Sequence, residues 1–237
     1  LPGLEPDGEF VLTSDEALGL ERLPSSVLIV GGGVIGVEWA SMLADFGVKV
    51  TLLEAADRLL PAEEEDVSRG MAAALAARGV DVRTEAAVRP ETLQTRRLGD
   101  RGEVRIEAER RGERFAAEAE LILVAVGRTP NTEGIGLENV NVALSGGAVR
   151  VNGFMQTSEP HIYAVGDVTG GLQTAHAASC QGVVAAEHIC GAADKPYDAS
   201  LVPRCVFSHP EAASVGLGEK QAKAAGYRTV AAKFPLR

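Results

Sequence analysis

A glycine-rich turn is the part of this sequence whose residue types and spacing are best suited to bind a ligand. Gly31, Gly33 and Gly36 have GxGxxG spacing and directly follow the apolar residues 27–30. In such a turn the first glycine permits the tight bend, the second lets a pyrophosphate approach the backbone, and the third lets helix and strand pack closely. Free N–H groups at the start of the following helix face the phosphates. The spacing therefore predicts a dinucleotide site.

Glu54 is the residue expected to discriminate between the two nicotinamide dinucleotides. It follows Gly36 by 18 residues and ends the next predicted strand, residues 49–54. A carboxylate at that place accepts hydrogen bonds from ribose hydroxyls and repels a 2′-phosphate, which favours NAD over NADP. The next arginine, Arg58, comes four residues later. The alternative is a glycine turn that binds nothing, with Glu54 as a solvated strand end.

Two further predicted strands end in residues that a ligand could approach. Gly127 follows the apolar residues 121–126, and a glycine there permits close approach of a ligand to the backbone, although a plain turn fits equally well. Asp167 follows the apolar residues 162–165, where it could accept a sugar or polyol hydroxyl or serve as a loop or N-cap residue. His176 begins a predicted helix, where backbone N–H groups are better placed than its ring to polarise a ligand oxygen.

The remaining acidic and histidine residues of interest have simpler interpretations. Glu38 lies in the first turn of the helix that follows the glycines, where a carboxylate complements the helix dipole. The triplet His209-Pro210-Glu211 could resemble acid–base machinery. Its position at a strand-to-turn junction favours a structural turn instead.

The three cysteines, Cys180, Cys190 and Cys205, form no CxxC pair. They also have no metal-ligand spacing with histidine, so the sequence predicts no metal site. We expect them to be small buried hydrophobic residues, and their odd, scattered number suits a reducing cytoplasm.

Composition limits the classes of protein to which the chain can belong. The 237 residues are 46% hydrophobic and 24% charged, with a formal net charge of −10. This charge argues against nucleic acid or an anionic membrane as the main partner, because both favour a basic surface. No apolar run approaches the ~20 residues of a membrane-spanning helix. Residues 1–6 have no basic region and no initiating methionine, so we expect neither a signal peptide nor a natural start.

Alternating strands and helices are predicted from the spacing of apolar residues and glycines. Residues 27–30, 49–54 and 80–84 are expected strands, and residues 34–46 and 63–78 are expected helices that end at Gly47 and Gly79; this βαβαβ order implies a parallel sheet. The other expected elements are a helix at 14–20 capped by Ser14 or Asp15, an antiparallel hairpin of 104–109 and 114–118 around 111–113, a strand at 121–126 buried on both faces, short strands around 149–151, a buried strand at 162–165, a helix at 175–190, a strand at 204–207 and a helix at 219–225.

Taken together, the motifs resemble the class I pyridine-nucleotide disulfide oxidoreductases, and the resemblance is strongest to members that oxidise dihydrolipoamide. The matching stretches are residues 31–38, 50–54, 125–132, 162–170, 175–182 and 207–216. The implied fold is α/β: a Rossmann-like NAD-binding domain with a parallel sheet plus an antiparallel meander, the returning part of a FAD-binding domain, and the start of an α+β interface (dimerisation) domain. The implied segments are a connector at 1–22, the NAD domain at 23–130, the returning FAD segment at 131–199 and the truncated interface domain at 200–237.

The resemblance also implies cofactors, partners and roles for individual residues. NAD and FAD are the implied cofactors, and Glu38 is the implied partner of a lysine near the flavin. A homodimer is implied, with a lipoyl-bearing acyltransferase of a 2-oxoacid dehydrogenase complex or a glycine-cleavage lipoyl protein as partner. The NAD contacts implied are Gly31, Gly32, Gly33, Val34, Ile35, Gly36, Glu38, Glu54, Val88 and Gly127. The FAD contacts implied are Asp167, Gln173, Thr174, Ala175 and His176.

Departures from the family pattern limit what this chain alone is expected to do. The first FAD glycine motif, the redox Cys-x4-Cys and the flavin-side lysine would lie upstream, and the active-site His-Pro with its glutamate downstream. Residues 132–199 would then pack on a flavin half that is outside the chain, which predicts exposed apolar surface around 162–165 and 175–190. Thr174 stands where the family usually has leucine. Alternative hypotheses are a mercuric reductase, a soluble transhydrogenase or an NADH oxidase of the same fold, and a catalytically inert NAD-binding module.

Overall fold

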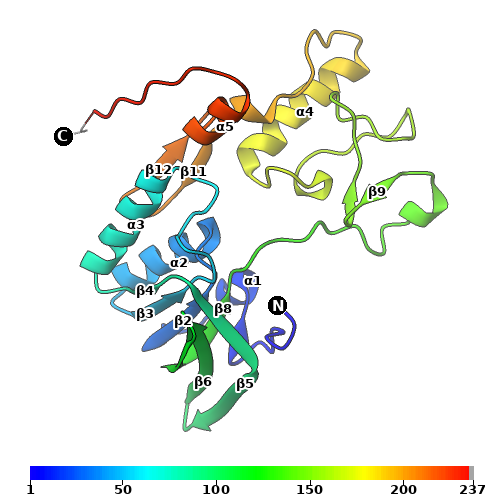
Figure 1. The fold of residues 1–237 in the computed structure, drawn as a ribbon. Helices are drawn as coiled ribbons and strands as arrows, with labels where there is room; N and C mark the ends of the chain where they lie inside the picture. The colour runs from blue at the N-terminus through cyan, green and yellow to red at the C-terminus, as the bar shows by residue number, and fades with distance from the viewer. Residues whose placement is uncertain (235–237) are drawn as a thin grey trace. The chain divides into compact units, whose positions relative to one another are not determined.

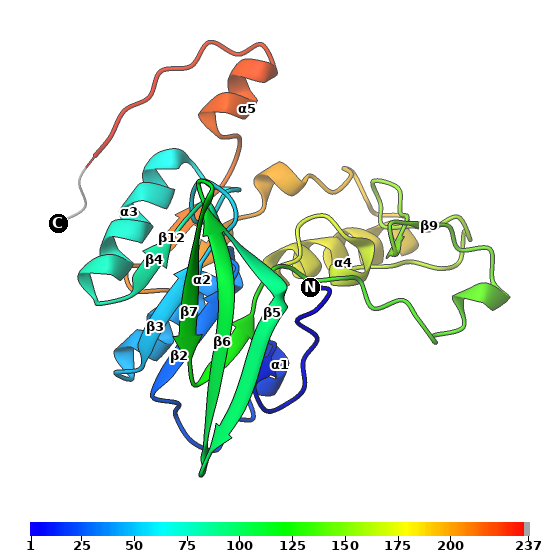
Figure 2. The ribbon, with the colours of Figure 1, turned by 60° about the horizontal axis from the view of Figure 1, so that its bottom comes forward.

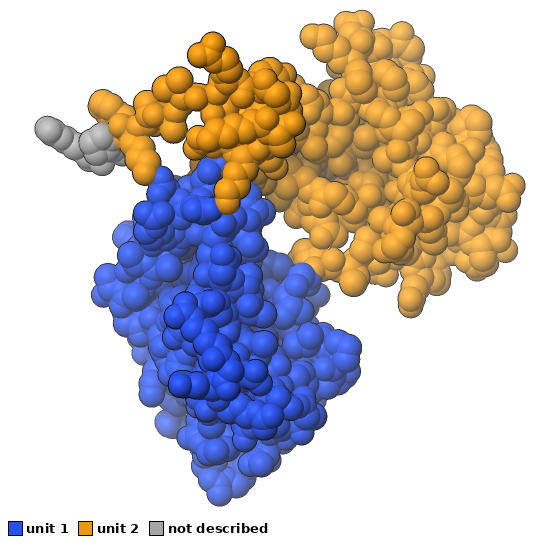
Figure 3. Space-filling model, viewed as in Figure 1, with its two compact units in different colours: residues 1–127, 206–212 blue, residues 128–205, 213–237 orange. Residues whose placement is uncertain are grey.

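The computed structural model describes residues 1–234 and divides them into two compact units, coloured separately in Figure 3. Unit 1 comprises Leu1–Gly127 together with Val206–Ala212. Unit 2 comprises Arg128–Cys205 and the described chain from Ala213 onward.

A five-stranded parallel sheet forms the centre of unit 1. Its strand order is β1-β8-β2-β3-β4, and every pairing in it is parallel. The predicted βαβαβ arrangement is therefore confirmed, while the edge strand β1 was not predicted. The strands are β1 (Val11–Leu12), β2 (Ser26–Val30), β3 (Lys49–Leu53), β4 (Asp81–Arg83) and β8 (Leu121–Val124), and the helices are α1 (Ser14–Ala17), α2 (Val34–Asp45) and α3 (Glu65–Ala77).

A second layer of unit 1 is a three-stranded antiparallel sheet in the order β5-β6-β7. Its strands are β5 (Ala86–Leu98), β6 (Arg101–Arg110) and β7 (Glu113–Ala119). Arg111 and Gly112, with φ values of 52° and 83°, connect β6 to β7, and two positive φ values suit the tight hairpin turn predicted here. Strand β5 was not predicted, because its polar, arginine-rich sequence shows little apolar alternation. Figure 2 shows β5–β7 lying in front of the parallel sheet.

The parallel sheet is buried on both faces because its strands alternate between two hydrophobic cores. Val27, Ile29, Leu121 and Leu123 belong to the core beneath the helices, which cover one face of the sheet in Figure 1. Leu28, Val30, Leu53 and Ile122 belong to the core shared with the antiparallel strands. Near-continuous apolar strands are typical of a sheet that is covered on both sides. The expectation that residues 121–126 are buried on both faces is confirmed for Leu121–Leu123, whereas Val124 is half-buried and Val126, beyond the end of β8, is 51% exposed.

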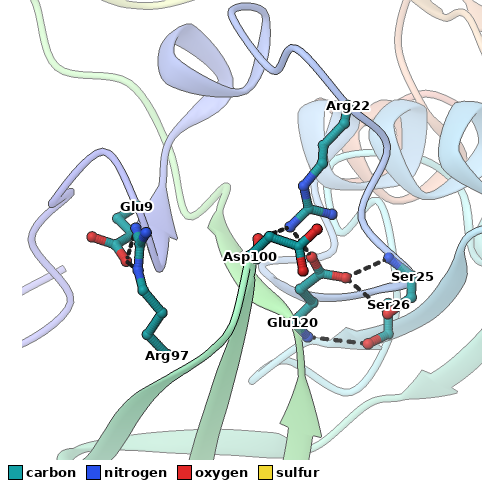
Figure 4. Close-up of polar contacts among 7 residues, drawn as sticks. All are labelled: Glu9, Arg22, Ser25, Ser26, Arg97, Asp100 and Glu120. Carbon is teal, nitrogen blue, oxygen red and sulfur yellow. Dashed lines mark hydrogen bonds and ion pairs between the residues drawn. The ribbon is translucent and has the colours of Figure 1, made fainter.

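A buried carboxylate fastens the amino-terminal ends of β2 and β8. The Glu120 side chain is 5% exposed and forms an ion pair with Arg22. Ser25 donates its backbone N–H and its hydroxyl to Glu120 Oε2 at 2.7 and 2.8 Å, as Figure 4 shows. Arg22 also donates to the Asp100 carbonyl at 2.9 Å, so one guanidinium connects the linker before β2 to the β5–β6 turn. Burial alone would raise the pKa of Glu120, but the hydrogen bonds from Ser25 and Arg22 hold that pKa below its ordinary value.

Unit 2 has little regular structure apart from one long helix. Gly146 and Gly147, both with positive φ, connect β9 to β10. The elements of unit 2 and of the two-stranded sheet at its boundary are η1 (Leu137–Asn139), β9 (Leu144–Ser145), β10 (Ala148–Val149), η2 (Asp167–Thr169), α4 (Ala175–Ile189), η3 (Ala199–Leu201), β11 (Arg204–Val206), β12 (Ala212–Ser214) and α5 (Glu219–Ala224). The helices predicted at 175–190 and 219–225 are confirmed within a residue at each end. The triplet at 209–211 lies in the turn between β11 and β12, as expected.

Two local predictions were wrong. The first helix is capped by Thr13, whose hydroxyl accepts the Asp15 N–H at 3.3 Å, and not by Ser14 or Asp15. Residues 162–165 were expected to form a buried strand, but only an isolated bridge between Gln156 and Tyr163 is formed there. These residues have the apolar composition of a central strand, but in the described chain they form no continuous ladder: Ile162 and Ala164 each make one backbone hydrogen bond to the segment 155–157.

The cysteines were also placed wrongly by the prediction. Cys180 and Cys190 are exposed, and Cys205 is half-buried. The buried residues of α4 are Ala177, Gln181 and Ala185, whose spacing of four defines one face of a helix. Cys180 lies off that face and Cys190 forms the C-cap, which explains their exposure.

Apolar exposure in unit 2 agrees with the sequence. Val165, Val183 and Ile189 are 39%, 57% and 63% exposed, which confirms the expected apolar surface around 162–165 and 175–190. No helix in the described part of the chain is both long and apolar enough to cross a membrane.

We predict that Glu120→Gln lowers the free energy of unfolding by roughly 1–3 kcal/mol at pH 7, because the hydrogen bonds from Ser25 and Arg22 lose their charged, buried acceptor. The folded pKa of Glu120 lies below its ordinary value of 4.5. The stabilisation is therefore complete above that value and is lost as the pH falls through the folded pKa. Urea unfolding between pH 3 and pH 7 should show the gap between wild type and variant closing toward acid. Glu118→Gln is the matched control, since Glu118 is an exposed partner of Arg105; an equal loss in both variants would contradict the assignment.

Candidate nucleotide and flavin sites

The glycine turn brings the end of β2 into contact with the end of β8. Gly31 has φ +112°, and a Cβ built on it would lie 2.4 Å from the Ala125 carbonyl oxygen. A Cβ on Gly36 would lie 1.9 Å from the Gly31 carbonyl oxygen. Because real Cβ atoms do not approach backbone oxygens so closely, both positions require glycine. The first and third glycines thus bind the strand, the turn and α2 into one tightly packed unit.

Gly33 differs from its two neighbours in the motif because it faces open space. No heavy atom lies within 4 Å of a Cβ built on it, and its φ of −72° is accessible to any residue. Gly33 is also the N-cap of α2 and supplies no side-chain cap. The N–H groups of Val34, Ile35 and Gly36 therefore begin the helix beside a surface that a pyrophosphate can approach. This arrangement fits a bound dinucleotide.

Glu54 is fixed at the end of β3 by backbone hydrogen bonds. Its Oε2 accepts the Gly32 N–H at 2.5 Å and its Oε1 accepts the Ala56 N–H at 2.6 Å. Each carboxylate oxygen has two lone pairs, so acceptor capacity remains for a ribose hydroxyl. The structure therefore brings Glu54 against the glycine turn and fixes its charge there.

Gly127 and Val88 complete the set of residues expected at this edge. Gly127 has φ +143° and open space on its Cβ side, and it comes two residues after Ala125, which touches Gly31. Val88 is a half-buried residue of β5 that packs against the second core. Strand β5 is connected to the site because the Ala86 N–H donates to the Glu54 carbonyl at 2.9 Å. All of these residues lie within unit 1, at the carboxyl ends of parallel strands or directly beside them.

The residues expected to contact flavin lie in unit 2. Asp167 begins a 3-10 turn and pairs with Arg128, whose Nε lies 3.4 Å from Oδ2. Thr174 caps α4 by accepting the Ala177 N–H at 3.2 Å, while Ala175 and His176 at the start of the helix are exposed. These backbone and side-chain groups suit a polar ligand with hydroxyl or carbonyl oxygens.

A pocket of about 550 Å³ adjoins these residues. Arg128, Arg150, Thr169 and Gln173 contribute polar side chains to its lining, and the glycine pair 170–171 contributes backbone. The sequence analysis included Gln173 but missed Arg128, although the latter follows Gly127 directly. The sequence could have indicated Arg128, because an arginine that follows a glycine at the end of a strand places a cation where the phosphate or carboxylate groups of a ligand bind.

Gln181 was also missed by the sequence analysis. It is buried in α4, and its Oε1 accepts the Gly166 N–H at 2.6 Å. This bond holds the Gly166 turn, and with it Asp167, against the helix. A polar residue inside an alanine-rich helix was the available signal.

Glu38, which lies just past the first turn of α2, is held by a backbone donor. Its Oε1 accepts the backbone N–H of Phe207 at 2.8 Å. The pairing of Glu38 with a lysine near the flavin, which the resemblance implies, stays a prediction. Among the described residues no group of three or more His, Cys, Asp or Glu side chains is arranged to hold a metal ion.

A parallel sheet with a glycine turn after one strand and a fixed acid after the next defines a dinucleotide-binding protein of the Rossmann class. The chain belongs to the pyridine nucleotide-disulphide oxidoreductase family, whose model it matches over residues 1–182. The family's dimerisation-domain model matches residues 202–237. Members of this family use FAD and NAD(H), and the resemblance drawn from the motifs is confirmed.

Curated relatives and solved structures give the same result. The chain is 54% identical over its whole length to a dihydrolipoyl dehydrogenase of Bacillus subtilis and 42% identical over 96% of its length to one of Chlorobaculum tepidum. Among solved structures, LpdA from Mycobacterium tuberculosis has a TM-score of 0.81 at 33% identity over 95% of this chain. The flavoprotein disulfide reductase RclA of Escherichia coli has a TM-score of 0.78 at 34% identity over 91% of it.

The chain spans about half the length of these proteins: 49% and 48% of the two curated relatives and 47% of each solved chain. Both candidate cofactor regions fall inside the half of these relatives that the chain covers. The redox pair of cysteines implied by the resemblance does not, because the three cysteines of this chain are widely separated.

We predict that alanine at two glycines of the turn has different effects on thermal stability. Gly33→Ala should leave thermal stability nearly unchanged, since its Cβ meets nothing, and should weaken NADH binding by placing a methyl group where a phosphate approaches. Gly36→Ala should lower the melting temperature as well, because its Cβ collides with the Gly31 carbonyl. Calorimetric melting and NADH titration by fluorescence measure both effects. Unchanged NADH affinity in a folded Gly33→Ala protein would contradict the phosphate assignment.

Proposed function

We propose that this chain carries the NAD site and part of the FAD site of a flavoprotein oxidoreductase that moves electrons between dihydrolipoamide, FAD and NAD. The observation that carries the proposal is the glycine turn with Glu54 fixed against it. The 54% identity to a dihydrolipoyl dehydrogenase supports this activity over that of other disulfide reductases of the same fold. The alternatives are a mercuric reductase, a soluble transhydrogenase, an NADH oxidase and an inert NAD-binding module.

In this proposal each part of the chain has a distinct task. Backbone N–H groups from Gly33 to Gly36 hold the NAD pyrophosphate, Glu54 accepts the ribose hydroxyls, and Val88 and Gly127 flank the nucleotide. Asp167 accepts a hydroxyl of the flavin's ribityl chain through the oxygen that Arg128 does not hold. FAD, when bound, would supply the group that exchanges a hydride with the nicotinamide of NAD. The start of α4, from Gln173 to His176, would present N–H groups to the oxygens of the flavin ring.

The proposed organisation and partners follow the same resemblance. Residues 1–22 would connect to the FAD domain, 23–130 form the NAD domain, 131–199 return to the FAD domain, and 200–237 begin the interface domain. The dimerisation-domain match supports a homodimer. The physiological partner would be a lipoyl-bearing acyltransferase of a 2-oxoacid dehydrogenase complex or a glycine-cleavage lipoyl protein, in the cytoplasm.

Nucleotide preference tests the proposed NAD site. The chain should bind NADH more tightly than NADPH, and Glu54→Gln should narrow that difference by roughly tenfold, equivalent to about 1.4 kcal/mol, as the charge that repels a 2′-phosphate is removed. Glutamine still offers an acceptor to Gly32, so the turn should stay folded. Isothermal titration with both nucleotides gives the ratio. Equal affinity of the wild type for the two nucleotides would overturn the assignment.

Turnover separates the whole enzyme from this chain. We expect the chain to bind NADH without forming NADH from dihydrolipoamide, since Cys180, Cys190 and Cys205 provide no close dithiol. Absorbance at the NADH band in the presence of dihydrolipoamide, NAD and FAD measures this. Sustained NADH formation by the purified chain would disprove this expectation.

A further inference from the structure

The side chain of Glu38 is held by a segment far from it in sequence. Its Oε1 accepts the Phe207 N–H at 2.8 Å, across 169 positions of the chain. Both groups belong to unit 1, because Val206–Ala212 folds with that unit. One carboxylate oxygen is thereby oriented by a backbone donor, and Oε2 stays available to a second partner.

The segment that supplies this donor is fastened to α2 and α3 by a polar network. His209 donates its N–H to Ser41 Oγ at 2.8 Å. Arg78 donates from NH1 to the His209 carbonyl at 2.7 Å and to Ser41 Oγ at 2.8 Å, and from NH2 to the Ser41 carbonyl at 3.0 Å. Arg78 also pairs with Asp45. The Arg78 side chain is 20% exposed, and its guanidinium connects the end of α3 to α2 and to the segment.

Three residues of α2 that take part in these contacts share one face of the helix. Glu38, Ser41 and Asp45 are spaced by three and then four positions, which aligns them along the helix surface. Hydrophobic packing fixes the segment in the same place, because Val206 is 3% exposed in the core beneath α2 and α3 and Ser208 is buried. A fixed segment gives the Phe207 N–H a fixed direction.

We propose that Arg78 is a positioning residue for Glu38, acting through Ser41 and the Val206–Ala212 segment. The network holds the Phe207 N–H in place. This N–H in turn orients the Glu38 carboxylate toward the lysine near the flavin that the family resemblance implies. This inference rests on the proposed function. It adds that the segment Val206–Ala212, which lies within the region matched by the dimerisation-domain model, determines the orientation of the Glu38 carboxylate on α2.

The first test measures the network in the chain without any nucleotide. Amide hydrogen exchange at Phe207–His209 should accelerate about tenfold or more in Arg78→Ala and several-fold in Glu38→Ala, because each loses a hydrogen bond that closes the segment. Glu38→Gln keeps an acceptor for the Phe207 N–H and should stay close to wild type. Arg69→Ala, at an exposed arginine of α3 paired with Asp66, is the matched control. Unchanged exchange in both alanine variants would overturn the network; it would leave the NAD assignment untouched.

The second test asks whether the network reaches the redox site. In the complete flavin-loaded enzyme, Arg78→Ala should slow flavin reduction by saturating NADH about tenfold while the Kd for NADH changes less than about twofold, as expected for loss of positioning. Glu38→Gln should slow the same step although its segment stays protected. Partial recovery in Arg78→Lys would support a role of the retained cation. If Arg78→Ala frees the segment and leaves flavin reduction unchanged, the positioning role is wrong.

Discussion

The close approach of α2 to β2 is the constraint on which the rest of unit 1 depends. A side chain at Gly36 would collide with the Gly31 carbonyl at 1.9 Å, and a side chain at Gly31 would collide with the Ala125 carbonyl at 2.4 Å. Only with both side chains absent can the helix begin directly at the end of the central strand. That position exposes the N–H groups of its first turn at the carboxyl edge of the sheet, where β3 delivers Glu54 and β8 delivers Gly127. The nucleotide site is thus a consequence of close packing and needs few dedicated side chains.

Most of unit 1 could be predicted because local signals and global fold agree there. The strands could be located from runs of apolar residues, in which neighbours such as Leu28 and Ile29 face the two different cores. The ends of the helices could be located within a few residues from Gly47 and Gly79, which have positive φ. Strand β5 was missed because its register depends on pairing with β6 and includes an irregularity between Arg89 and Gln94. The Thr13 cap was missed because Ser14 is an equally good capping residue by type, and the choice depends on backbone geometry. The contacts of Arg78 and Glu38 with residues 207–209 join distant parts of the sequence, and no local pattern encodes them.

Unit 2 was harder to predict for a different physical reason. The apolar composition of residues 162–165 is that of a central strand, yet a strand requires neighbours to accept its backbone hydrogen bonds. Within the described residues only Gln156 pairs with Tyr163. Helix α4 has the same character: Ala177, Gln181 and Ala185 are buried, while Val183 and Ile189 remain exposed on other faces. A sequence suited to burial on several sides thus adopts its helix, whose hydrogen bonds are internal, but not its strand, whose hydrogen bonds are external.

Backbone donors orient three acidic side chains that lie near the two ends of the parallel sheet. Glu54 accepts the N–H groups of Gly32 and Ala56, Glu38 accepts that of Phe207, and Glu120 accepts that of Ser25 beside its pair with Arg22. A carboxylate tied to the main chain loses its freedom when the fold forms, so little further entropy is lost when its remaining lone pairs meet a ligand. At the amino-terminal end of the sheet the hydrogen bonds of Glu120, whose side chain is 5% exposed, contribute to stability. Glu54 and Glu38, at the other end, keep acceptor capacity. The same interaction therefore stabilises one edge of the sheet and prepares the opposite edge for binding.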